Sequence, residues 1–157
     1  MSAPVQPLSV DVGMLIRRAP HEVFEALADP ATTTRFWYTK SSGRMVGGAE
    51  LVWEWEMYGA SRTIQVEKSE PDKTIRFAWN NYAPDESTTV EFSLTPYEND
   101  TTYLRVTESG FTGDLDTRIA NLRDSTAGFA FMLCGLKACL EHDVTLQLTL
   151  DEHPPNL

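Results

Sequence analysis

The chain has 157 residues, a length typical of one globular domain. Apolar residues make up 41% of it, and four Trp with seven Phe supply large side chains for a hydrophobic core. No apolar run approaches the roughly 20 residues that span a bilayer, and the first ten residues lack the charged and apolar regions of a secretory signal. We therefore expect a cytoplasmic protein that does not associate with membranes.

The charge balance is acidic, with 23 Asp and Glu against 13 Lys and Arg and a formal net charge of −10. Proteins bind nucleic acids largely by neutralising phosphates with Lys and Arg, so this balance argues against a nucleic-acid partner. Anionic membranes are disfavoured for the same reason.

Residues 10–17 alternate between apolar and polar or small side chains, which predicts a half-buried strand. A helix is expected to start at Ala19-Pro20, because Pro is tolerated in the first turn, and to end at Asp29-Pro30. Thr32–Trp37 is interpreted as a second short helix. Period-two alternation then returns in segments separated by short polar turns, which indicates an antiparallel meander. The predicted strands are 51–58, 62–67, 74–79, 88–96 and 101–109.

The apolar residues from about Arg118 to His142 recur at helical spacing and predict the longest helix. Gly128 and Gly135 lie seven residues apart, on nearly the same face, and suggest close approach of a strand or ligand, or a bend. The last stretch, Val144–Leu150, alternates again and predicts a short strand. It would add to the edge of the sheet or join a two-fold homodimer.

A sheet with one apolar face must be covered, and the long helix is the only predicted element large enough to cover it. We therefore expect an α+β fold in which a curved antiparallel sheet wraps around the C-terminal helix, with a pocket between them. No linker or repeat divides the chain, so residues 1–157 are interpreted as a single domain with a core at about 10–142 and a tail at 143–157.

Several short motifs occur in this order of elements: Ala19-Pro20-His21-Glu22-Val23-Phe24, Asp29-Pro30, Phe36-Trp37, Trp53-Glu54, Ser109-Gly110-Phe111 and 135–142 (GLKACLEH). Together they resemble the family of activator of Hsp90 ATPase homologue 1-like proteins, in the START-like (polyketide cyclase, Bet v 1) superfamily. The resemblance covers roughly residues 10–142 and implies the helix-grip fold, with a cavity between sheet and helix. Members include a eukaryotic co-chaperone domain and many bacterial proteins, while superfamily relatives bind hydrophobic molecules or catalyse cyclisation or hydrolysis.

Strand parity places the apolar residues of each strand on the inner face of the sheet, together with Arg62 and Glu108. These two charges would form an ion pair or a rim, or they would orient a ligand. The aromatic residues would be core or would form the wall of a pocket. Trp37 would lie at the mouth of this pocket or would belong to a cap that seals the end of the sheet. The expected ligand-binding residues are Trp37, Trp53, Trp55, Arg62, Phe77, Trp79, Phe92, Glu108, Phe129 and Leu133.

These features favour a binding protein for a small hydrophobic ligand, aromatic or lipid-like. Two alternatives stay open: a co-chaperone-like interaction domain, and a cyclase or hydrolase that uses Glu108 and Arg62. We do not expect an Hsp90 partner, because no additional Hsp90-binding domain is present. We expect no metal or other cofactor and no catalytic triad, because the sequence lacks HxxxH, GxSxG, GxGxxG and GxxxxGK[ST] motifs in a suitable context.

Overall fold

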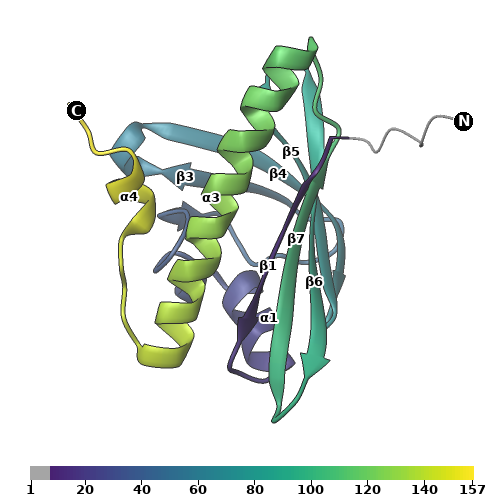
Figure 1. Cartoon of the computed structure of the whole chain (residues 1–157), viewed down its shortest axis with the longest axis vertical. Helices are drawn as coiled ribbons and strands as arrows, with labels where there is room; N and C mark the ends of the chain where they lie inside the picture. Colours follow the sequence, from purple (N-terminus) through teal and green to yellow (C-terminus); the bar gives the residue numbers. More distant parts are fainter. Residues whose placement is uncertain (1–7) are drawn as a thin grey trace, which may run out of the picture.

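The computed structural model describes residues 8–157 and contains a seven-stranded antiparallel sheet with a long helix packed on it (Figure 1). The sheet order is β1-β7-β6-β5-β4-β3-β2. The strands are β1 (Val10–Ile16), β2 (Lys40–Ser41), β3 (Glu50–Trp55), β4 (Ala60–Glu70), β5 (Thr74–Ala83), β6 (Glu86–Tyr97) and β7 (Thr101–Ser109). The helices are α1 (Pro20–Ala28), α2 (Pro30–Thr33), the 3-10 turn η1 (Glu56–Tyr58), α3 (Leu115–His142) and α4 (Leu148–Glu152).

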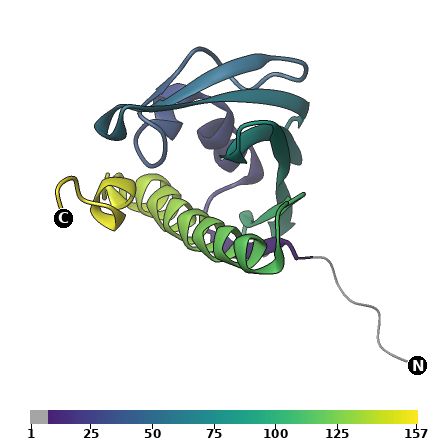
Figure 2. The same ribbon diagram turned by 90° about the horizontal axis from the view of Figure 1, so that it is seen from above.

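The sheet is strongly curved, and α3 lies across its concave side (Figure 2). Seen from above, the sheet arches from β1 beneath α3 around to β4 and β5 on the opposite side, with α1 inside the curve. This arrangement confirms the predicted α+β helix-grip fold. Within residues 8–157, no helix has the length and apolar character needed to cross a membrane. The expectation about a secretory signal concerns mainly residues 1–7, which lie outside the described residues.

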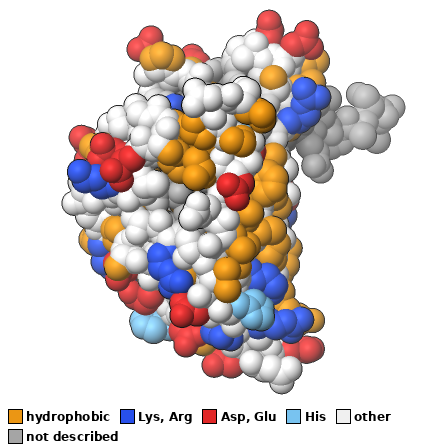
Figure 3. Space-filling model, turned by 90° about the vertical axis from the view of Figure 1, so that its left-hand side faces the viewer, with side chains coloured by type: hydrophobic (Ala, Val, Ile, Leu, Met, Phe, Trp, Pro, Cys, Tyr) orange, Lys and Arg blue, Asp and Glu red, His pale blue; other side chains and the backbone are white. Residues whose placement is uncertain are grey.

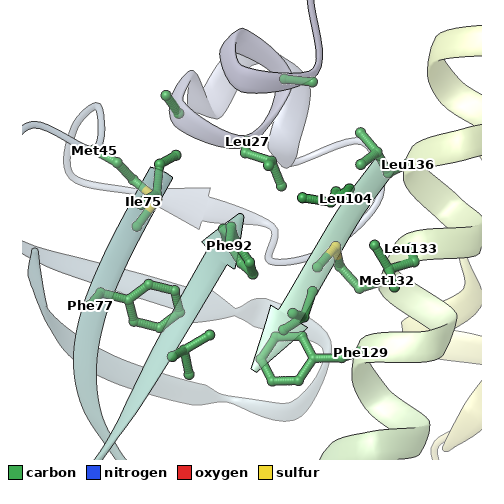
Figure 4. Close-up of a cluster of buried hydrophobic side chains, with 14 of the residues drawn as sticks. Leu27, Met45, Ile75, Phe77, Phe92, Leu104, Phe129, Met132, Leu133 and Leu136 are labelled. Carbon is green, nitrogen blue, oxygen red and sulfur yellow. The ribbon is translucent and has the colours of Figure 1, made fainter. Parts of the chain in front are cut away.

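The inner face of the sheet carries the side chains that alternation assigned to it. Ile64, Phe77 and Phe92, on three neighbouring strands, are fully buried. Figure 4 shows Ile75, Phe77 and Phe92 of the sheet pointing toward Phe129, Met132, Leu133 and Leu136 of α3, with Leu27 of α1 beside them. Burying each such side chain contributes about 1.5–3 kcal/mol, so this contact supplies much of the stability of the fold.

The helical segment after β1 is divided at Asp29-Pro30. Asp29 has extended backbone angles, φ −96° and ψ 116°, as expected for a residue before Pro, and this ends α1. The Asp29 carboxylate then accepts a hydrogen bond from the backbone N–H of Ala31 (N–O 3.0 Å) and caps α2. The second helix therefore starts and ends earlier than the predicted Thr32–Trp37, and Trp37 lies in the chain that follows it.

Two of the sequence predictions near the open end of the fold are wrong. The strand that contains Trp53 ends at Trp55, and Met57 lies in the 3-10 turn η1, so it is not part of the inner sheet face. The tail does not form a strand: Leu148–Glu152 is the short helix α4. Asp143 and Gln147 both adopt left-handed backbone angles, which turn the chain and prevent the straight extension that strand pairing requires. The tail therefore offers no strand for a dimer.

The two glycines of α3 have different surroundings. A Cβ atom built on Gly135 would lie 3.1 Å from the Cβ of Phe36 and 3.3 Å from its carbonyl oxygen, so glycine permits close approach of that loop. A Cβ atom on Gly128 would meet no atom within 4 Å. One glycine thus allows tight packing, and the other faces open space.

Alanine substitutions at these positions are expected to have opposite effects. Gly128→Ala should raise the free energy of unfolding by up to about 1 kcal/mol, because Ala favours helix and meets no obstacle. Gly135→Ala should lower it by about 1 kcal/mol, because the clash with the Phe36 backbone outweighs the helix preference. Urea denaturation of both variants measures the difference, and an equal increase in both would contradict the close packing at Gly135.

Candidate ligand-binding site

A pocket of about 220 Å³ lies between the N-terminal half of α3, the β3–β5 side of the sheet and the C-terminal segment. We call it the aromatic pocket. It receives side chains from every layer of the fold, and its lining consists of Trp37, Trp55, Tyr58, Ala60, Arg62, Trp79, Asn81, Tyr82, Asp124, Ser125, Gly128, Phe129, Thr149, Glu152 and His153. The absence of a side chain at Gly128 gives the pocket room on its helix side.

Three indole rings form the apolar wall of the aromatic pocket. The ring centroids of Trp37, Trp55 and Trp79 lie 6.1–6.4 Å from one another, in tilted or edge-to-face arrangements. Phe129 of α3 joins them, with its ring centroid 5.8 Å from that of Trp37 and 6.3 Å from that of Trp79. Such ring pairs are favourable beyond their buried area, so the wall is held in a defined shape.

Trp37 separates the aromatic pocket from the core. Of the two alternatives for Trp37, the mouth of the pocket or a cap, the structure is nearer to the cap: its ring centroid lies 4.9 Å from that of Trp53 and 6.0 Å from that of Phe92. As a result, four of the expected ligand-binding residues are in the core and do not line this pocket: Trp53, Phe77, Phe92 and Leu133. Sequence alternation identified the correct face of the sheet but could not show which ring would cover it.

Glu108 is fully buried at the end of β7, although its position at a strand end suggested the rim. One carboxylate oxygen accepts hydrogen bonds from Trp79 Nε1 (2.9 Å) and Thr88 Oγ1 (2.5 Å). The other accepts from the Ser125 hydroxyl of α3. Trp79 and Ser125 line the aromatic pocket, so Glu108 positions two of its lining residues from behind.

Arg62 lies at the edge of the aromatic pocket, partly exposed, and does not pair with Glu108. Its Nε donates to Asn81 Oδ1 (3.0 Å), and its Nη1 donates to the Ser61 carbonyl (2.7 Å). Two strands, β5 and β6, separate it from Glu108, which at the usual strand spacing is roughly 14 Å of sheet. Of the alternatives that the sequence left open, the ion pair between Arg62 and Glu108 does not form, and only Arg62 lies at the rim.

Two carboxylates and a tyrosine of the pocket were not singled out from the sequence. Tyr82 donates a hydrogen bond to Asp124 Oδ2 (2.7 Å), and its own pKa is raised by burial and by that carboxylate. Glu152 reaches the pocket from α4. Burial raises the pKa of the Glu152 carboxyl; His153 partly offsets this effect, and the negative charge of Asp124 adds to it. The spacing of Ser125 from Leu122 and Phe129 was the only sequence signal that this polar stretch of α3 faces the sheet.

The C-terminal segment closes one side of the aromatic pocket. The Tyr58 hydroxyl lies 2.7 Å from the carbonyl oxygen of Thr149 and 2.9 Å from that of His153, which ties α4 to η1. A second pocket of about 220 Å³ lies on the other side of Trp37, between the loop after α2 and residues 145–150. Figure 3 views the molecule from this side and shows hydrophobic side chains next to acidic ones on the surface.

We predict that Glu108→Ala lowers the free energy of unfolding by about 3 kcal/mol or more, because three buried donors lose their acceptor. Glu108→Gln should lower the free energy of unfolding by less, because its amide oxygen can still accept hydrogen bonds from some of these donors. Guanidinium denaturation measures both, with Glu91→Ala on the opposite face of the sheet as the control for loss of a carboxylate. A Glu108→Ala variant as stable as that control would show that the buried network is not needed.

Comparison with known proteins places the chain in a family. A family model described as Activator of Hsp90 ATPase homolog 1-like protein matches residues 17–141. No curated protein sequence matches significantly. Among solved structures, protein SSP2350 from Staphylococcus saprophyticus is 27% identical, with a TM-score of 0.76 over 88% of this chain and 96% of that one.

Two further solved structures share the fold at lower identity. The Aha1 protein of Colwellia psychrerythraea, solved as a dimer, is 23% identical, with a TM-score of 0.73 over 85% of this chain and 96% of that one. DynU16, a protein of the dynemicin biosynthetic locus, is 22% identical, with a TM-score of 0.77 over 89% of this chain, which spans only 49% of that longer protein. Because the family model covers most of the sequence, the chain belongs to the family of activator of Hsp90 ATPase homolog 1-like proteins.

Proposed function

We propose that this protein binds a small aromatic molecule in the aromatic pocket, between the sheet and α3. The observation that carries the proposal is Gly128. A glycine inside a helix costs about 1 kcal/mol relative to Ala. At Gly135 the close approach of Phe36 explains that cost, but no protein atom lies near the missing side chain of Gly128. Room for a ligand beside the indole wall accounts for the glycine.

The size and lining of the pocket favour a ring compound over a lipid chain. A cavity of about 150 Å³ lined by apolar side chains binds benzene. The aromatic pocket, at about 220 Å³, suits one or two fused rings, and the faces and edges of Trp37, Trp55 and Trp79 offer stacking surfaces. A few polar groups at its edge, including Arg62 and Asn81, would orient the ligand, as is common in small-molecule sites.

The other functions considered from the sequence receive less support from the geometry. A reaction that uses Glu108 and Arg62 together would require the two groups to face one substrate atom, whereas two strands lie between them. Glu108 also accepts hydrogen bonds from three protein groups and is covered by the pocket lining. A co-chaperone role rests on the family description alone. A homodimer stays a prediction, which sedimentation at high protein concentration tests.

A large side chain added at Gly128 should weaken binding without disturbing the fold. We expect calorimetric titration to show binding of the neutral two-ring probe 2-naphthylmethanol to the native protein. The variant Gly128→Leu should bind at least about tenfold more weakly, because its side chain fills the pocket. Ala127→Leu, which adds the same side chain at the adjacent exposed position of α3, should bind as the native protein does. Absence of binding to the native protein, or equal affinity of the Gly128→Leu variant, would overturn the proposal.

A further inference from the structure

We infer that the aromatic pocket selects ligands that carry a protonated amine beside the aromatic ring, with the amine held between Asp124 and Glu152. This inference rests on the proposed function and adds the chemical class of the ligand. It is carried by the presence of two carboxylates from two different elements in the lining of one aromatic cavity: exposed Asp124 belongs to α3 and half-buried Glu152 to α4.

Neither carboxylate is neutralised by Lys or Arg in the described part of the chain. Asp124 accepts a hydrogen bond from the Tyr82 hydroxyl, and the basic group paired with Glu152 is the exposed imidazole of His153, 3.6 Å away. Burial raises the pKa of the half-buried Glu152 carboxyl, and Asp124 is close enough for its negative charge to raise that pKa further. Like charges in such a site are unfavourable unless a cation lies between them.

The balance of charge around the aromatic pocket favours a cationic ligand over an anionic one. Arg62 is the only Lys or Arg among the lining residues, and its guanidinium already donates to Asn81 and to the Ser61 carbonyl. The two carboxylates of Asp124 and Glu152 outnumber this single guanidinium. The carboxylate of Glu108 lies directly behind Trp79 and Ser125. An anionic ligand would have to approach three carboxylates to reach a single guanidinium.

The aromatic wall favours the same class of ligand. An ammonium group near the face of a Trp or Tyr ring is attracted by the negative charge of the ring face, most strongly for Trp. The aromatic pocket contains three Trp and two Tyr side chains. A ligand whose ring packs on the indoles and whose amine reaches Asp124 and Glu152 would therefore satisfy both the apolar and the charged parts of the lining.

The second carboxylate comes from a segment that the family model does not cover. The match ends at residue 141, whereas Glu152 lies in α4, which Tyr58 holds over the pocket. The inferred amine site therefore combines α3, which the family model covers, with the C-terminal segment, which it does not cover.

Three probes with the same rings test the inference by calorimetric titration at neutral pH: 2-naphthylmethylamine, 2-naphthylmethanol and 2-naphthoate. The amine should bind at least about tenfold more tightly than the alcohol, the effect of one hydrogen bond between charged groups, and the carboxylate should bind most weakly. Glu152→Gln and Asp124→Asn should each reduce, severalfold, the ratio of the affinity for the amine to the affinity for the alcohol measured in the same variant. Glu91→Gln, which removes the same charge from the outer sheet face, should leave this ratio as it is in the native protein.

The outcomes separate this inference from the proposed function. If none of the three probes binds, the proposed function itself is wrong. If the alcohol binds but the amine binds no more tightly, or the carboxylate binds best, the pocket binds aromatic molecules and the inferred amine selection is wrong. A preference for the amine that persists in both Glu152→Gln and Asp124→Asn would also overturn it, and thermal melting of each variant confirms that it is folded.

Discussion

The contact between α3 and the curved sheet determines what the rest of the molecule can do. From Phe129 onward α3 packs closely, with Phe129, Leu133 and Leu136 buried against the inner face of the sheet. Before Gly128, Ser125 is the only buried residue of the helix, and it is held there by Glu108. The C-terminal half of the helix therefore covers the core, whereas its N-terminal half packs less closely and borders the aromatic pocket. Two glycines on the same helix face mark the difference, since one meets Phe36 and the other meets empty space.

Side-chain hydrogen bonds, rather than apolar packing, hold the N-terminal half of α3 in place beside the aromatic pocket. Glu108, buried beneath the pocket, fixes the indole of Trp79 and the hydroxyl of Ser125 from two different layers of the fold. A buried carboxylate without donors would be costly, so its three hydrogen bonds stabilise it and also set the shape of the wall. On the other side, Tyr58 ties α4 to the sheet side of the pocket. The pocket thus depends on a small number of side-chain hydrogen bonds, which makes its lining more specific than a gap in a packed core.

Much of the fold could be predicted because apolar side chains repeat with the period of each element. Alternation assigned Ile64, Phe77 and Phe92 to the inner face of the sheet, and helical spacing assigned Leu133 to the covered face of α3. The candidate site was only partly predictable. Trp55, Trp79 and Phe129 line the pocket as expected, but Trp37 covers the rings behind it, and this depends on the path of the loop after α2. Asp124 and Glu152 carry no pattern that marks them, because a polar residue on a helix looks the same whether it faces solvent or a cavity. The strand predicted for the tail does not form, because Asp143 and Gln147 have left-handed backbone angles and turn the chain away from an extended path.

A ligand that enters the aromatic pocket beside Trp37 would change the environment of its indole rings, so the indole N–H resonances of the four tryptophans report on binding there. In a nuclear magnetic resonance titration with 2-naphthylmethylamine, we expect large shifts of the indole signals of Trp37, Trp55 and Trp79 and of the amide of Gly128. Trp53, which lies behind Trp37 in the core, should shift much less. Shifts confined to residues outside the pocket, or no saturable shift at all, would show that the aromatic pocket is not the binding site.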